Sequence, residues 1–100
     1  MDSTVHVELV RNETGHLEAQ CDAPEWQQGD RLIRHLKEHF AARVIDKAEG
    51  PDARTWSLEI RGEQIVVNQW DTGDISCFAK NVTGEGLIET LAADVRRQVG

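Results

Sequence analysis

Two histidines four residues apart are the side chains in this sequence whose spacing most suggests chemistry. They are the first and last residues of the segment His-Leu-Lys-Glu-His at positions 35–39. On a helix, His35 and His39 project from neighbouring turns and can reach one metal ion. A catalytic zinc site also requires a third protein ligand and an open coordination position. The question is whether the rest of the chain supplies them.

The surroundings of this segment argue against a metalloprotease. The five residues resemble the H-x-x-E-H proteases, but those enzymes are much larger and take their third ligand from a distant glutamate, which nothing in this chain matches. Three positive neighbours disfavour a bound cation: Arg31, Arg34 and Lys37. Helical spacing places both histidines on a flank of the apolar stripe. We interpret 35–39 as a solvated helix flank, with metal binding or small-molecule processing through His35 and His39 as the alternative function.

A second coincidence lies at Asp71, Thr72 and Gly73, which spell the catalytic tripeptide of aspartic proteases. In that family the tripeptide follows an apolar run early in an all-β chain. Here it follows Asn-Gln-Trp and suits a hairpin loop. The sequence contains no G-x-G-x-x-G, P-loop or G-x-S-x-G motif. We therefore expect no catalytic residues, no cofactor and no enzymatic activity.

Composition sets the class of protein. One hundred residues with 39% hydrophobic content predict a single globular domain over 1–100. The net charge of −7 repels phosphate backbones and disfavours nucleic-acid binding. No apolar run approaches the roughly 20 residues of a membrane span. The first ten residues lack the pattern of a signal peptide, so we expect a cytoplasmic protein in which Cys21 and Cys77 are reduced, buried hydrophobes.

Hydrophobic periodicity predicts strands and helices in the order β-β-α-β-β-β-β-α. Asp22 and Pro24 favour a helix start, although Gly29 delays its regular part to about Asp30. Thr83 is the predicted cap of the last helix. The predicted strands are 4–10, 16–21, 43–45, 54–60, 64–70 and 74–80, and the helices end near 42 and span 84–98. Tight turns and two one-sided helices indicate an α+β two-layer sandwich, an antiparallel sheet with both helices on one face.

The alternating patterns also predict strand registers. Pairing Val10 with His16 sets Leu9 opposite Leu17 and Glu8 opposite Glu18. A two-residue turn at Gly62 and Glu63 sets Ile60 opposite Ile65 and Leu58 opposite Val67. In the last hairpin, Val66 lies opposite Phe78.

These registers leave bulky side chains on the face that no helix covers. Val66, Trp70 and Phe78 lie there, with Glu8, Glu18 and Asp74 as an acidic rim. Aromatic groups among small polar residues are typical of a binding hot spot. Two alternatives stay open: a register shifted by one residue would place these side chains in the core, or a loop or terminus would cover them.

The function that these features favour is binding to another protein. We expect a small acidic non-enzymatic domain that uses this face for a protein partner or for a homodimer. The chain is similar in type to short acidic bacterial proteins, among them inhibitors that neutralise a toxin encoded beside them. That similarity is one of size and charge and not of motif, so an adaptor, inhibitor or immunity role remains a hypothesis.

Overall fold

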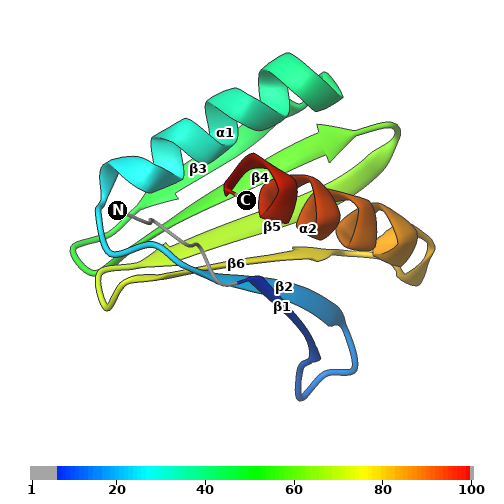
Figure 1. Cartoon of the computed structure of the whole chain (residues 1–100), viewed down its shortest axis with the longest axis horizontal. Coiled ribbons are helices and arrows are strands. Elements are labelled where there is room, and N and C mark those ends of the chain that lie inside the picture. The colour runs from blue at the N-terminus through cyan, green and yellow to red at the C-terminus, as the bar shows by residue number, and fades with distance from the viewer. Residues whose placement is uncertain (1–6, 100) are drawn as a thin grey trace.

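The computed structural model describes residues 7–99, and the side chains of residues 7–95. The described residues form six strands and two helices, and Figure 1 shows how they are arranged. The strands are β1 (Val7–Arg11), β2 (Leu17–Asp22), β3 (Arg43–Glu49), β4 (Ala53–Ile60), β5 (Glu63–Trp70) and β6 (Asp74–Ala79). The helices are α1 (Gln27–Phe40) and α2 (Glu85–Val99), and a short 3-10 turn, η1 (Val82–Gly84), precedes α2.

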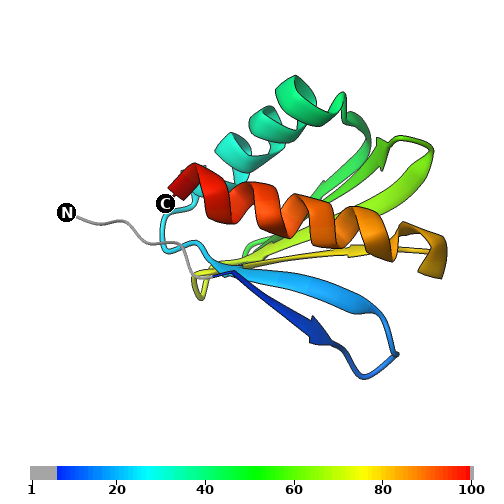
Figure 2. The same cartoon turned by 45° about the vertical axis from the view of Figure 1, so that its right-hand side comes forward.

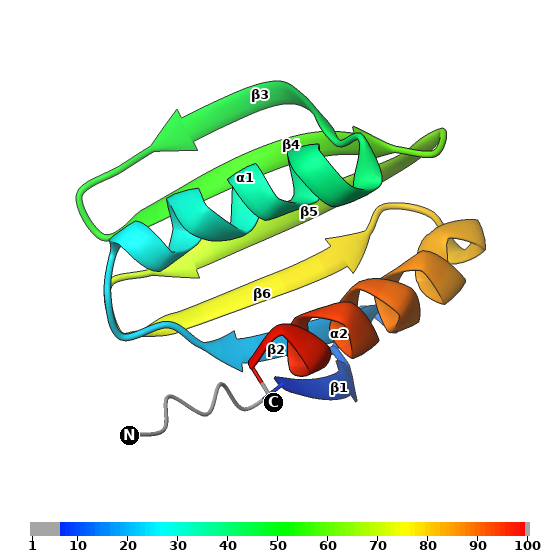
Figure 3. The same ribbon diagram turned by 45° about the horizontal axis from the view of Figure 1, so that its top comes forward.

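The strands form one antiparallel sheet in the order β1-β2-β6-β5-β4-β3. Both helices lie on the same side of it, which Figure 2 shows most clearly. In Figure 3, α1 runs over the β3–β5 half of the sheet and α2 over the β1, β2 and β6 half. The predicted two-layer α+β sandwich, with its element order, is confirmed.

The core lies between the helices and the inner face of the sheet. Alternate residues of the central strands point into it, because successive side chains of a strand face opposite sides. Leu58, Ile60, Ile65 and Val67 are fully buried there. The stripes of the two helices close the core from above, through Ile33, Leu36, Ile88, Leu91 and Ala92.

Two of the three predicted hairpin registers are wrong by two residues, although every strand keeps its predicted inward face. In the first hairpin, Leu9 pairs with Ala19 and Glu8 with Gln20, so the predicted Glu8–Glu18 pair does not form. The loop spans residues 12–16 instead of the predicted 11–15, because the side-chain oxygen of Asn12 accepts hydrogen bonds from the backbone N–H groups of Thr14 and His16 and closes the turn there. Val5 and His6 lie outside the described residues.

The second hairpin turns one residue earlier than predicted. Its two turn residues are Arg61 and Gly62, both with positive φ, which is the backbone of a type I′ turn. Leu58 therefore pairs with Ile65, and Ile60 with Glu63. The prediction failed because an arginine with φ of 53° carries no turn signal in the sequence.

Three further element boundaries differ from the prediction. Asp22 ends β2 instead of capping α1, which begins at Gln27 after Trp26 with no side-chain cap. Strand β3 extends to Glu49, with a bulge near Ile45 that shifts its register against β4. Thr83 lies in η1, where its hydroxyl donates to Glu63 Oε1.

Helix α1 approaches the sheet closely at one glycine. A Cβ atom on Gly29 would lie 2.1 Å from Gln69 Oε1 and 2.8 Å from Trp56 Cη2. Beside it, the buried guanidinium of Arg54 lies between the rings of Trp26 and Trp56, at 4.3 and 4.8 Å. Arg54 donates hydrogen bonds to Gln69 Oε1 and to the Trp26 carbonyl, both at 2.5 Å. These contacts fix the start of α1 on β4 and β5.

Helix α2 is joined to its neighbours by polar and charged side-chain contacts. His35 of α1 pairs with Asp94 of α2, with 2.6 Å between Nε2 and Oδ2. Arg11, at the end of β1, forms an ion pair of 3.0 Å with Glu85, and the hydrogen bond from Arg11 lowers the pKa of that carboxyl. Neither helix, within the described residues, has the length and apolar character needed to cross a bilayer.

Candidate functional site: the outer face of the sheet

The face of the sheet opposite the helices carries all six residues of the predicted binding surface. We call it the outer face. Figure 2 shows no helix on that side of the described chain. Strand pairing arranges its residues in cross-strand rows: Asp22–Asp74–Trp70; Glu8–Gln20–Ser76–Asn68–Thr55; and Val10–Glu18–Phe78–Val66–Ser57.

Its aromatic and aliphatic residues lie where the sequence placed them. Val66 and Phe78 are cross-strand partners, as predicted, and both are half-buried. The His16 ring packs against Phe78 at 5.6 Å between centroids and covers part of it. Trp70, at the end of β5, remains 40% exposed. The alternative in which a shifted register buries Trp70 in the core is therefore wrong, and Trp70 is an accessible apolar group of this face.

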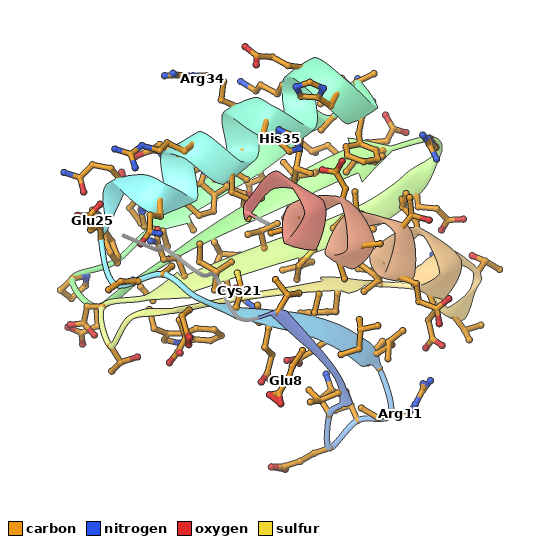
Figure 4. All side chains as sticks on the ribbon, in the orientation of Figure 1. Glu8, Arg11, Cys21, Glu25, Arg34 and His35 are labelled. Carbon is orange, nitrogen blue, oxygen red and sulfur yellow. The ribbon has the colours of Figure 1, made fainter. Side chains whose placement is uncertain are left out.

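The predicted acidic residues gather beside Trp70 around an open hollow of about 460 Å³. We call it the acidic hollow. Four carboxylates line it, Glu8, Glu18, Asp22 and Asp74, together with Trp70 and Ser76. Figure 4 shows Glu8 pointing away from the helices on this side of β1. No basic side chain is among its described lining residues.

Within the hollow, the carboxylates have few partners that offset their charge. Glu18 accepts hydrogen bonds from the neutral amides of Asn12 and Gln20, at 2.7 and 3.1 Å. Asp74 is 3.4 Å from the Thr72 hydroxyl. Among the described residues, no cation forms an ion pair with Glu18, Asp22 or Asp74. The negative charge of these three carboxylates is therefore not offset by an ion pair with a described cation.

The floor of the acidic hollow contains a hydroxyl group without a partner. Ser76 is only 4% exposed and lines the hollow, and no hydrogen bond joins its side chain to another described residue. No fully enclosed side-chain oxygen or nitrogen of the described chain lacks a partner, so the Ser76 hydroxyl opens into the hollow. An oxygen in that position can accept a hydrogen bond from a ligand.

The negative field of the acidic hollow reaches the thiol on the other side of β2. Burial, followed by the charges of Asp22 and Asp74, raises the pKa of Cys21 to about 11. Burial also raises the pKa of Cys77 to about 12. Both cysteines are free and belong to the core-facing positions of their strands; the predicted burial is confirmed for Cys77, whereas Cys21 is only half-buried.

The histidines of the alternative hypothesis occupy a different setting from the one predicted. His39 is exposed, but His35 is only 19% exposed and lies between the helices, where Figure 4 labels it. The solvated-flank interpretation is therefore wrong for His35, since α2 supplies Asp94 as its partner. The two rings lie 4.4 Å apart. No group of three potential metal ligands is formed by the described residues, so metal binding through these histidines stays a prediction.

Sequence reasoning missed two members of the acidic hollow. Asp22 was interpreted as a helix cap, although it continues the outward positions of Glu18 and Gln20 along β2. The alternation of inward and outward side chains along this strand could have placed Asp22 on the outer face. For Ser76 the outward position was visible, but its burial and its free hydroxyl depend on the sheet around it.

Comparisons with known proteins do not assign this chain to a family. No protein-family model matches the chain, and neither the curated proteins nor the solved structures give a match.

Proposed function

We propose that this protein is a small non-enzymatic binding domain that holds another protein on the outer face of its sheet. The observation that carries the proposal is Trp70, which stays 40% exposed on a face without a helix. Tryptophan is enriched among the residues that contribute most to protein binding. Half-buried Val66 and Phe78 are cross-strand partners on the same face, separated from Trp70 by the row of Ser76 and Asn68, and add a second apolar contact.

Charge favours a different protein over a second copy of this chain. Two copies meeting through the outer face would bring two sets of Glu8, Glu18, Asp22 and Asp74 together. Like charges brought together in an interface cost several kcal/mol. A partner with a basic surface gains from the same field, both in affinity and in the rate of encounter. An adaptor, inhibitor or immunity role fits such binding.

The proposal is tested by affinity capture from cells of the source organism, followed by reconstitution. The bait proteins are wild type, Trp70→Ala and the milder Trp70→Phe. Val82→Ala is the matched control, because Val82 is 73% exposed and lies in η1, outside the outer face. Captured proteins are identified, purified and mixed with each variant on a sizing column.

We expect one partner to co-elute with wild type and Val82→Ala and to be lost with Trp70→Ala. Circular dichroism verifies that each variant is folded. Capture that is equal for wild type and folded Trp70→Ala would remove the proposal, as would a wild-type protein that self-associates through this face and captures nothing.

A further inference from the structure

We infer that the acidic hollow is the subsite for a basic side chain, lysine or arginine, that projects from the protein partner. This inference rests on the proposed function and names the chemistry of the contact. It stands on three observations: an open hollow lined by four carboxylates, an exposed indole at its edge, and a buried hydroxyl without a partner in its floor.

The carboxylates are arranged for an extended cation and not for a metal ion. Asp22 and Asp74 are cross-strand partners, Glu18 is further along β2, and Glu8 comes from β1. No three metal-ligating groups of the described residues converge on one point. Carboxylates spread around an open hollow suit an ammonium or guanidinium group, whose several N–H donors point in different directions.

Trp70 provides the complementary apolar contact. It is the cross-strand partner of Asp74, so its ring and that carboxylate share one end of the hollow. The aliphatic stem of a lysine or arginine packs on such a ring, and the cationic head is attracted to its face. An acidic residue beside an exposed tryptophan therefore selects a basic side chain over an apolar or acidic one.

Ser76 would orient the bound cationic group by accepting a hydrogen bond from it. Its hydroxyl is the one polar side-chain group in the hollow's described lining that is almost wholly buried. It lies in the row next to Asp74 on β6, on the same face. A cation held by Asp74 and Asp22 can donate a further hydrogen bond to Ser76 Oγ, which binds it more firmly than surface charge alone.

The test uses defined peptides and does not require the partner. A six-residue lysine peptide, its fully acetylated form and a six-residue arginine peptide are titrated into ¹⁵N-labelled protein, and the Trp70 indole and Ser76 amide signals are followed. Variants are Asp22→Asn, Asp74→Asn and Ser76→Ala. The control is Glu38→Gln, since Glu38 is an exposed carboxylate on α1.

We expect the basic peptides to shift the signals of Trp70 and Ser76, and the acetylated peptide to leave them in place. Each aspartate variant should weaken binding about five- to tenfold, and Ser76→Ala should weaken it about threefold. Glu38→Gln should bind as wild type does. Equal weakening by Glu38→Gln, or absence of shifts at the hollow, would overturn the inference.

The two proposals fail in distinguishable ways. If Trp70→Ala abolishes partner binding while the aspartate variants retain it, the outer face binds a partner without a basic side chain in the hollow. In that case the proposed function stands and this inference falls. Spermidine that binds at the hollow more tightly than either basic peptide would also overturn it, because the ligand would then be a free polyamine.

Discussion

Asp22 and Asp74 are direct cross-strand partners on β2 and β6, so the fold holds two carboxylates side by side on its outer face. Like charges in directly opposite positions destabilise a sheet. No cation of the described residues pairs with either of them. A cost of this kind is expected where the residues serve a bound cation instead of the stability of the chain.

The first prediction concerns this pair. Asp22→Asn should stabilise the folded protein by about 0.2–1 kcal/mol, because it removes the repulsion from Asp74 and keeps a side chain of similar size. Urea denaturation at low ionic strength measures the change. Glu38→Gln, which has no such neighbour, should leave stability within about 0.5 kcal/mol of wild type. A destabilised Asp22→Asn would mean that the carboxylate contributes to the fold.

The second prediction tests how closely α1 lies on the sheet. Gly29→Ala should destabilise the protein by about 1–3 kcal/mol, because the new methyl group overlaps Gln69 and Trp56. Gly86→Ala is the matched control, since Gly86 lies in the other helix, α2, and a Cβ atom there would have no neighbour within 4 Å. It should be neutral or stabilising by up to about 1 kcal/mol. Chemical denaturation that finds Gly29→Ala as stable as wild type would contradict the packing.

The third prediction follows from the raised pKa of the thiols. At pH 8 the pKa of about 11 leaves Cys21 with roughly a hundredth of the thiolate of an unperturbed cysteine. Iodoacetamide should therefore modify folded Cys21 at least about a hundredfold more slowly than the urea-unfolded chain, and Cys77 more slowly still. Mass spectrometry over time measures both rates. Modification of native Cys21 at the unfolded rate would contradict its burial.

The raised pKa values of the two thiols also predict in which direction the stability of the fold changes at alkaline pH. Below about pH 8 both thiols are largely neutral in the folded and the unfolded chain, so they contribute little to the pH dependence. From about pH 8 to 10 the unfolded chain ionises its cysteines, while the folded chain keeps Cys21 and Cys77 protonated. Thiol ionisation therefore lowers stability as the pH rises through this window, and Cys77→Ala should reduce that slope.

Much of the fold follows from alternation and amphipathic stripes. The inward faces of β1, β2, β4, β5 and β6 were predicted, because a shift of two residues in a register preserves the face. The Val66–Phe78 pairing was predicted correctly, since the loop at Asp71–Gly73 has recognisable turn chemistry. The other two registers failed at Asn12, whose side chain closes a loop that begins one residue later than predicted, and at Arg61, which adopts a backbone that is rare for arginine.

The site was predicted less completely than the fold. The outward position of Trp70, and the placement of Glu8, Glu18 and Asp74 on that same face, follow from strand alternation. The juxtaposition of Asp22 with Asp74 does not, because β2 and β6 are distant in sequence and their pairing is set by the order of strands in the sheet. His35 illustrates the same limit: its partner, Asp94, comes from a helix 59 residues away.

The fourth prediction addresses the alternative function. Protein purified without a histidine tag should contain well under one equivalent of zinc or nickel. His35 Nε2 already has a hydrogen-bond partner in Asp94. In addition, the positive charges of Arg34 and Lys37 on the same helix disfavour a bound cation. Elemental analysis after dialysis measures the content. One equivalent of metal that disappears in His39→Ala would establish a metal site and would favour the alternative.

The most direct test of the central claim is the dissociation constant of the reconstituted complex, measured for wild type and Trp70→Ala by titration calorimetry. If the outer face is the docking surface, Trp70→Ala should raise the dissociation constant by about thirtyfold or more, while Val82→Ala leaves it unchanged. A folded Trp70→Ala that binds the partner as tightly as wild type would contradict the claim.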